Sequence, residues 1–298
     1  MSQVASRYSE SGSRSPRRPP GPRKTAAPGR VSPAGRDVPA RAVLAAAEAT
    51  VATGGPEVIY GRNAVREALR GRRQVHALLL ASAGEGDEDD LERTFRELTR
   101  DGSGKPPIVH RLSPRELTER LQTPDHQGFA AEVDAYPYVE EERLLTDANL
   151  LVALDEVQDP HNLGAVIRTA EATGAGVVIT RHRAAEVTAA VVRASAGATE
   201  HALVARVRNL SDFLTAAKGR GFWIYGAEAA AEHDYAAQDY SYPTCFVLGS
   251  EGQGVGRRVA SLCDVMINLP LKGRVGSLNV SVSAGVLLYE ALRQRGRQ

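Results

Sequence analysis

The sequence has little of what several protein classes require. Its 298 residues include only two cysteines, Cys245 and Cys263, too few for a disulfide framework or a cysteine-rich zinc site, and we expect no metal site. No apolar run approaches the roughly 18 to 20 residues that cross a bilayer, so we expect a soluble protein without a membrane span. Nothing at the N-terminus has the pattern of a secretory signal. Together these absences predict a reducing, cytoplasmic setting.

The net charge of +1 hides an uneven distribution. Residues 1–41 hold nine Arg or Lys against Glu10 and Asp37, a charge of +7, which leaves −6 for the rest of the chain. Residues 1–56 are rich in Ser, Pro, Gly and Arg, and we expect a disordered tail because they cannot bury enough apolar surface to offset the entropy of ordering. Such a tail fits a non-specific grip on phosphates, a solubilising extension or an organellar transit peptide. Its prolines disfavour the last of these, since they break an amphipathic helix.

From residue 57 the chain alternates between apolar runs and helical stretches. The runs VIY, HALLLA, PIVH and GFAAEV read as strands, and residues 89–100 and the stretch SPRELTERL read as helices. In the second helix Ser113 and Glu116 have the spacing of a capping box, with Pro114 at the first helical position. The pattern predicts a small α/β domain over residues 57–134. An acidic linker is expected over residues 135–149.

After residue 149 six apolar runs recur: LLVAL, VVIT, ALVA, FWIY, CFVL and VMINL. Continuous rather than alternating apolar strands are typical of a parallel sheet covered on both faces, which we predict for residues 150–298. The first helix between these runs has an apolar stripe at Leu163, Val166, Ile167 and Ala170, and Gly174 is placed to end it. Arg168 falls outside the stripe.

Three polar segments follow predicted strands, where α/β proteins bind their ligands. They are LDEVQDPHNLGAVIRTAEATG (154–174), VLGSEGQGVG (247–256) and INLPLKGRVGSLNVSVSAGVLLYEAL (267–292). Each also has a plain structural interpretation. The first fits a helix capped by Asn162 with a solvated Arg168, the second an ordinary glycine-rich turn, and the third close helix packing with Ser277 and Asn279 as capping groups.

In their order and spacing the three segments resemble the motifs of the SpoU (TrmH-type) 2′-O-methyltransferases of the SPOUT superfamily. The resemblance covers residues 150–298. Residues 57–134, through GRNAVREAL and DHQGFAAEV, resemble the L30e-like RNA-binding domain that precedes the catalytic domain in many members. The resemblance implies an α/β fold with a SPOUT-type parallel sheet and a C-terminal deep trefoil knot, preceded by the L30e-like domain and the disordered tail. It also implies a homodimer through the knotted domain, in which the partner chain completes each active site.

The family's functional positions are all present. The resemblance implies catalytic roles for Asn162, Arg168, Glu251, Ser277 and Asn279, and S-adenosylmethionine binding at Gly249, Ser250, Gly252, Leu269 and Leu278. A free guanidinium stays protonated and is a poor general base, so we expect Arg168 to hold a phosphate or the developing alkoxide. Direct proton abstraction by Arg168 is left open.

Four arginines near residue 66 form a candidate RNA contact. Arg62, Arg66, Arg70 and Arg73 are spaced by four, four and three residues, so a helix through them would present one basic face. The same spacing also fits an ordinary solvated face.

The resemblance therefore implies an S-adenosylmethionine-dependent RNA ribose 2′-O-methyltransferase, and we expect its target to be a guanosine of 23S rRNA. A tRNA 2′-O-methyltransferase or an antibiotic-resistance rRNA methylase is an alternative within the family. An inactive RNA-binding or ribosome assembly factor is an alternative of another class. A Rossmann-type dinucleotide enzyme is disfavoured because neither G-x-G-x-x-G nor a P-loop pattern is present where it would be needed.

Overall fold

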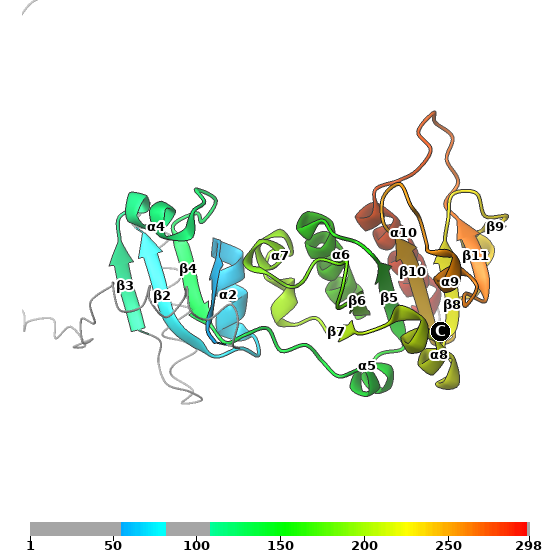
Figure 1. Cartoon of the computed structure of the whole chain (residues 1–298), viewed down its shortest axis with the longest axis horizontal. Helices are drawn as coiled ribbons and strands as arrows, with labels where there is room; N and C mark the ends of the chain where they lie inside the picture. The colour runs from blue at the N-terminus through cyan, green and yellow to red at the C-terminus, as the bar shows by residue number, and fades with distance from the viewer. Residues whose placement is uncertain (1–54, 82–107, 297–298) are drawn as a thin grey trace, which may run out of the picture. The chain divides into compact units, whose positions relative to one another are not determined.

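The computed structural model describes residues 55–81 and 108–296. Nearly all of the expected tail over residues 1–56, and the whole helix expected over residues 89–100, lie outside these ranges. Within them the strands form two sheets, one of four strands and one of seven (Figure 1). No helix in the described ranges is long and apolar enough to cross a membrane.

The smaller sheet has the strand order β1-β4-β2-β3. Its elements are β1 (Glu57–Tyr60), α2 (Arg62–Arg70), β2 (Val75–Ala81), β3 (Ile108–Leu112), α4 (Pro114–Leu121) and β4 (Phe129–Val133). β4 runs antiparallel to β1 and β2, whereas β3 is parallel to β2. Each strand coincides with one of the apolar runs, and Ile59, Leu78 and Phe129 are buried in the core beside it.

The predicted capping box at the start of α4 is confirmed. The Ser113 hydroxyl accepts a hydrogen bond from the Glu116 backbone N–H at 3.2 Å, and the Ser113 N–H donates to the Glu116 carboxylate at 2.7 Å. Two amides that the first turn leaves without helical partners are thereby satisfied. Such caps typically contribute about 1 kcal/mol to stability.

The larger sheet has the strand order β7-β6-β5-β10-β8-β11-β9, and every pairing in it is parallel. Its strands are β5 (Leu150–Asp155), β6 (Gly176–Thr180), β7 (Val204–Val207), β8 (Trp223–Ala227), β9 (His233–Asp234), β10 (Thr244–Gly249) and β11 (Val265–Asn268). The parallel sheet predicted from the six apolar runs is confirmed. Only β9 was not predicted, because its two residues are polar and exposed.

Helices cover both faces of this sheet. They are α5 (Glu141–Asp147), α6 (Pro160–Thr173), α7 (Ala189–Ala194), α8 (Leu210–Gly219), α9 (Arg257–Ala260) and α10 (Val280–Arg295), with short 3-10 turns η1 (Ala198–Glu200) and η2 (Tyr235–Ala237). One buried cluster joins α6, α7 and α10 to the sheet, and another joins α5, α8 and α9 to it. The apolar strands are therefore buried on both sides, as their composition predicted.

Two local expectations need correction. Asp159, rather than Asn162, caps α6: its carboxylate accepts a hydrogen bond from the His161 N–H at 3.0 Å, and Pro160 occupies the first helical position. The acidic stretch expected to be the linker was given no helix, but it contains α5, whose Leu144 and Leu145 are buried in the second cluster. The predicted apolar stripe of α6 is confirmed. Gly174, predicted to end this helix, is its C-cap with φ of 71°.

Candidate functional site

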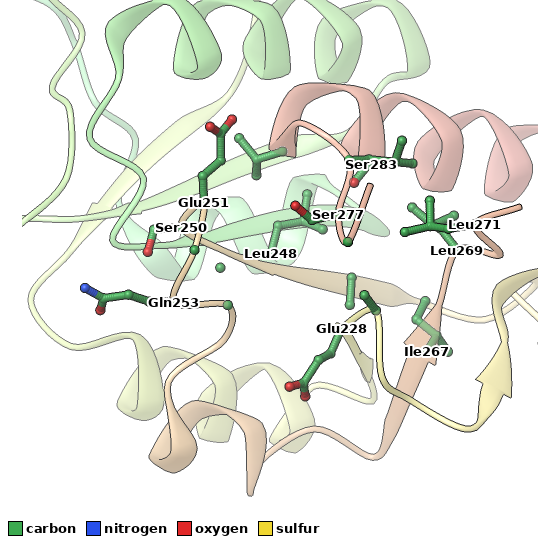
Figure 2. A pocket seen from close by; sticks show the side chains of 18 residues that line it. Glu228, Leu248, Ser250, Glu251, Gln253, Ile267, Leu269, Leu271, Ser277 and Ser283 are labelled. Carbon is green, nitrogen blue, oxygen red and sulfur yellow. The ribbon is translucent and has the colours of Figure 1, made fainter. Parts of the chain in front are cut away.

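A cavity of about 370 Å³ opens at the carboxyl ends of β8, β10 and β11 (Figure 2). Its lining comes from four segments: Ala227 to Ala229 at the end of β8, Leu248 to Gly254 at β10, Ile267, Leu269 and Leu271 at and after β11, and Gly276 to Leu278, Val280 and Ser283 at the start of α10. Cavities of this size commonly hold small ligands, and parallel sheets bind theirs at the carboxyl ends of the strands.

A tight glycine-rich turn forms one wall of the cavity. Gly249 ends β10 so close to Gly254 that an added Cβ would lie 1.9 Å from the Gly254 carbonyl carbon. The Gly254 N–H donates to the Ser250 carbonyl at 3.0 Å and closes the turn. Gly252 and Gly254 have φ of 88° and 66°, values that favour glycine. The turn therefore presents backbone rather than side chains to most of this wall.

Three polar side chains from the three sequence segments meet beside this turn. The Asn279 side-chain amide donates to Glu251 Oε1 at 2.7 Å and to Asn162 Oδ1 at 2.8 Å. The Asn162 amide donates to the same Glu251 oxygen at 3.1 Å. Asn279 also caps α10, since its Oδ1 accepts the Ser281 N–H at 2.9 Å. The network fixes the start of α6, the turn and the start of α10 relative to one another.

The structure brings together most of the residues predicted for the site. Seven of them line the cavity: Gly249, Ser250, Glu251, Gly252, Leu269, Ser277 and Leu278. Figure 2 shows Ser250 and Glu251 on the turn, with Leu269 on the far side of the cavity and Ser277 between them. Asn162 and Asn279 do not line it but are hydrogen-bonded to Glu251, which does.

Arg168 is the exception. It lies exposed on α6, outside the cavity lining, and has no ion pair or hydrogen bond to another described side chain. Within one chain it is therefore placed neither to bind a ligand of this cavity nor to support the α6 core.

Sequence reasoning missed the segment after β8. Ala227, Glu228 and Ala229 line the cavity, and the Glu228 N–H donates to the Ile267 carbonyl at 3.0 Å. The run FWIY could have indicated this segment, because the residues that follow each strand of a parallel sheet lie at the same edge. The three polar segments drew attention to the other strands instead.

Of the four candidate RNA contacts, three lie on α2 and one does not. Arg62, Arg66 and Arg70 belong to the helix, which ends at Arg70. Arg73 is buried, with its Nε 3.0 Å from the Glu200 carboxylate and its Nη1 3.2 Å from that of Glu57. The prediction that Arg73 contacts RNA is wrong. Gly71 ends the helical repeat, so the spacing of the arginines no longer applies beyond it.

Comparisons with known proteins agree on the family. The sequence model of the SpoU rRNA Methylase family matches residues 149–289, and that of the RNA 2'-O ribose methyltransferase substrate binding domain matches residues 58–139. The putative TrmH family tRNA/rRNA methyltransferase YacO of Bacillus subtilis is 41% identical over 80% of this chain and 96% of its own length.

Solved structures give the same result. The SpoU methyltransferase AviRb of Streptomyces viridochromogenes, in complex with the cofactor AdoMet, matches with a TM-score of 0.68 and 25% identity, over 86% of this chain and 97% of that one. An AdoMet-bound rRNA methyltransferase from Sinorhizobium meliloti matches with a TM-score of 0.67 and 25% identity, over 80% and 87%. The chain therefore belongs to the SpoU (TrmH) family of S-adenosylmethionine-dependent RNA methyltransferases.

Proposed function

We propose that this enzyme methylates a ribose 2′-hydroxyl, and that its target is a guanosine of 23S rRNA. The observation that carries the proposal is the network of Glu251, Asn162 and Asn279 beside a cavity walled by a glycine turn. The match of residues 58–139 to a substrate-binding domain of RNA 2′-O ribose methyltransferases supports the ribose as acceptor. Several relatives have names that read rRNA or tRNA/rRNA methyltransferase, which supports ribosomal RNA. The choice of a guanosine rests on the sequence resemblance.

The cavity fits S-adenosylmethionine by its chemistry. Ile267, Leu269 and Leu271 give an apolar wall suited to a purine ring, and the turn from Ser250 to Gly254 offers backbone groups for polar contacts. Gly249 leaves no room for a side chain beneath that turn. When bound, the cofactor supplies an electrophilic methyl group on sulfur.

The protein must orient the ribose and help its hydroxyl proton to leave. Glu251 accepts hydrogen bonds from both Asn162 and Asn279, so the orientation of the two amides is fixed before RNA arrives. We assign Arg168 an electrostatic role, in which its permanent positive charge stabilises a phosphate or the developing alkoxide. Ser277 lies in the cavity wall, where its hydroxyl can contact either reactant.

The position of Arg168 supports a homodimer. Val282, Tyr289 and Leu292 are spaced by seven and three residues along α10 and leave 51%, 53% and 39% of their surface exposed. A stripe of this kind is typical of a protein interface. Since α10 packs on α6, which carries Arg168, we propose that two copies pair through these helices and that Arg168 of each chain serves the cavity of the other.

The proposal includes the knotted path expected for the family. The segment after β11 lines the same cavity as the turn after β10, and the chain then enters α10, which packs against β10, β5 and α6. This return of the chain across the turn supports a C-terminal knot.

The decisive experiment measures transfer of labelled methyl groups from S-adenosylmethionine to rRNA by the wild type and by Arg168→Ala. We expect kcat/KM to fall at least ~100-fold, comparable to the loss of an oxyanion-stabilising group, with affinity for adenosylhomocysteine unchanged. Arg220→Ala, at an exposed arginine after α8, is the control. A decrease of kcat/KM of tenfold or less would show that Arg168 is an ordinary solvated surface residue. No transfer by the wild type would favour an assembly factor.

Two further measurements separate the finer alternatives. Mapping of 2′-O-methyl groups in rRNA and tRNA, with and without the gene, tests the 23S guanosine against a tRNA or resistance target. Mixing Arg168→Ala with Gly249→Ala tests the shared site, because random pairing gives heterodimers with one intact site and about a quarter of wild-type activity. A mixture without activity would place Arg168 in the cavity of its own chain.

A further inference from the structure

A second cavity, of about 470 Å³, lies outside the methyl-transfer site. It is lined by Arg62, Asn63 and Arg66 of α2 and by Gln127 and Phe129 at the start of β4. None of these residues lines the first cavity. Its lining combines two guanidinium groups, two carboxamides and a buried aromatic residue.

The fold holds the two sides of this cavity together by backbone contacts. The Gly61 N–H donates to the Phe129 carbonyl at 2.9 Å, and the Arg62 N–H donates to the Gln127 side-chain oxygen at 3.2 Å. Gly61 has φ of 102°, a conformation that glycine adopts readily and other residues rarely do. The start of α2 is therefore fixed against the turn that carries Gln127.

That turn is itself held by hydrogen bonds. The buried ring of His126 accepts the Gly128 N–H at its Nδ1, at 2.9 Å, and contacts the Thr118 hydroxyl through its Nε2 at 2.8 Å. Gln127 adopts φ of 55°, in the left-handed region that a non-glycine residue keeps only where its surroundings demand it. The surroundings therefore set the backbone at Gln127, and its side-chain oxygen is held by the Arg62 N–H.

The chemistry of the lining points to a nucleotide. Guanidinium groups bind phosphates with two parallel hydrogen bonds, and carboxamides both donate and accept, as the edge of a nucleobase requires. Asn and Gln pair with base edges for this reason. In an RNA duplex the deep major groove hides those edges, whereas an unpaired nucleotide exposes them. A recess with both kinds of group is thus suited to a nucleotide that is not base-paired.

We propose that this second cavity binds one unpaired nucleotide of the RNA substrate, with its phosphate against Arg62 and Arg66 and its base edge against Asn63 and Gln127. The proposal rests on the proposed function, because that function supplies RNA as the substrate. It gives the N-terminal domain a recognition site distinct from a general electrostatic attraction to RNA.

The test uses the full-length protein and two substitutions with a matched control. Asn63→Ala removes a carboxamide that is exposed and has no partner among the described side chains, so the fold should tolerate it. Arg66→Ala removes one guanidinium. Arg115→Ala is the control, because that side chain is 88% exposed on α4 and pairs with Glu119. The probes are single-stranded RNA homopolymers of the four bases and a mixed-sequence RNA duplex of the same length.

We expect Arg66→Ala to weaken binding of every probe by roughly three- to tenfold and to lower the salt dependence by about 0.7 per lost phosphate contact on single strands. Asn63→Ala should weaken only single-stranded probes and change their rank order. Equal behaviour of Arg66→Ala and Arg115→Ala would overturn the phosphate assignment. Unchanged binding by Asn63→Ala, or an equal loss on the duplex, would overturn the base assignment.

Turnover on rRNA separates this proposal from the proposed function. Asn63→Ala should raise KM for rRNA and leave kcat and adenosylhomocysteine affinity unchanged. If the wild type shows the expected RNA preferences but transfers no methyl group, the proposed function fails and the nucleotide site stands. If the wild type methylates rRNA and Asn63→Ala does so with the same KM, the nucleotide site fails alone.

Discussion

Asp155 accepts a hydrogen bond from the backbone N–H of Gly256, with 2.8 Å between Oδ2 and the amide nitrogen, although the two residues are 101 positions apart. Asp155 ends β5 and lies opposite Gly249 in the parallel register with β10. The glycine-rich turn that starts at Gly249 is therefore fastened at its far end by a carboxylate from the neighbouring strand. This contact makes Asp155 a positioning residue for the turn that walls the proposed cofactor cavity.

Replacement of Asp155 should weaken cofactor binding without removing any group that lines the cavity. A hydrogen bond to a charged group typically contributes about 1.5 to 3 kcal/mol, so we expect Asp155→Ala to bind adenosylhomocysteine roughly 10- to 100-fold less tightly. Asp155→Asn keeps an acceptor oxygen and should retain most of the affinity. Calorimetric titration measures both variants. Wild-type affinity in Asp155→Ala would show that the turn holds its shape unaided.

The two ends of the turn should respond differently to added side chains. At Gly249 a Cβ has no space, since it would overlap the Gly254 carbonyl group, and we expect Gly249→Ala to abolish detectable adenosylhomocysteine binding. At Gly252 a Cβ would meet no atom within 4 Å, and the obstacle is only the φ of 88°. The left-handed conformation costs a non-glycine residue about 1 to 2 kcal/mol. Gly252→Ala should therefore weaken adenosylhomocysteine binding only moderately. A larger loss of affinity in Gly252→Ala than in Gly249→Ala would contradict this account of the turn.

Local signals in the sequence predicted the elements that depend on neighbouring residues. The capping box at Ser113 needs only a partner three positions away, and the apolar stripe of α6 needs only helical periodicity. Both are therefore readable from sequence. The six apolar runs predicted the parallel strands for the same reason.

The sequence was less informative where the outcome depends on distant partners. Asn162 is suited to capping by its residue type, yet Asp159 takes that role and Asn162 bonds to Glu251, 89 positions away. Arg73 continues a helical spacing, yet the helix ends first and a buried Glu200 pairs with it. The cavity's lining after β8 required knowledge of which strands are neighbours. The family resemblance gave most of the remaining site residues, since composition does not indicate their roles.

The buried pair of Arg73 and Glu200 leads to a prediction about stability. Both side chains are 1% exposed, so removal of Arg73 leaves the Glu200 carboxylate buried without its charged partner. Such substitutions typically cost about 3 to 5 kcal/mol, whereas replacement of both by apolar residues is often neutral or stabilising. We expect Arg73→Met to lower the free energy of unfolding by that amount in urea denaturation.

The double variant Arg73→Met, Glu200→Leu should recover most of the loss. Neither change should alter the salt dependence of RNA binding in folded protein, because Arg73 is not on the surface. If RNA affinity depended less on salt concentration in the double variant than in the wild type, Arg73 would be an RNA contact after all.

We expect His126 to make the N-terminal domain sensitive to acid. Burial lowers the pKa of His126 below its ordinary value of 6.5, and the nearby Asp125 offsets only part of this. The ring is neutral when Nδ1 accepts the Gly128 N–H and Nε2 donates to Thr118, whose hydroxyl in turn donates to the Pro114 carbonyl. Protonation at Nδ1 removes the acceptor for Gly128.

The sign of the effect follows from the lowered pKa. Below pH 6.5 the unfolded chain binds a proton at His126 more readily than the folded chain does, so this contribution to stability is complete above pH 6.5 and is lost as the pH falls through the folded pKa. We expect the free energy of unfolding of the wild type, measured in urea, to fall as the pH is lowered from about 7.5 to about 5. In His126→Gln, which has no group titrating at this position, the free energy of unfolding should fall less steeply over the same range. If His126→Gln and the wild type lose stability in parallel over this range, the acid sensitivity belongs to other groups and the ring of His126 is not held in its neutral form by the fold.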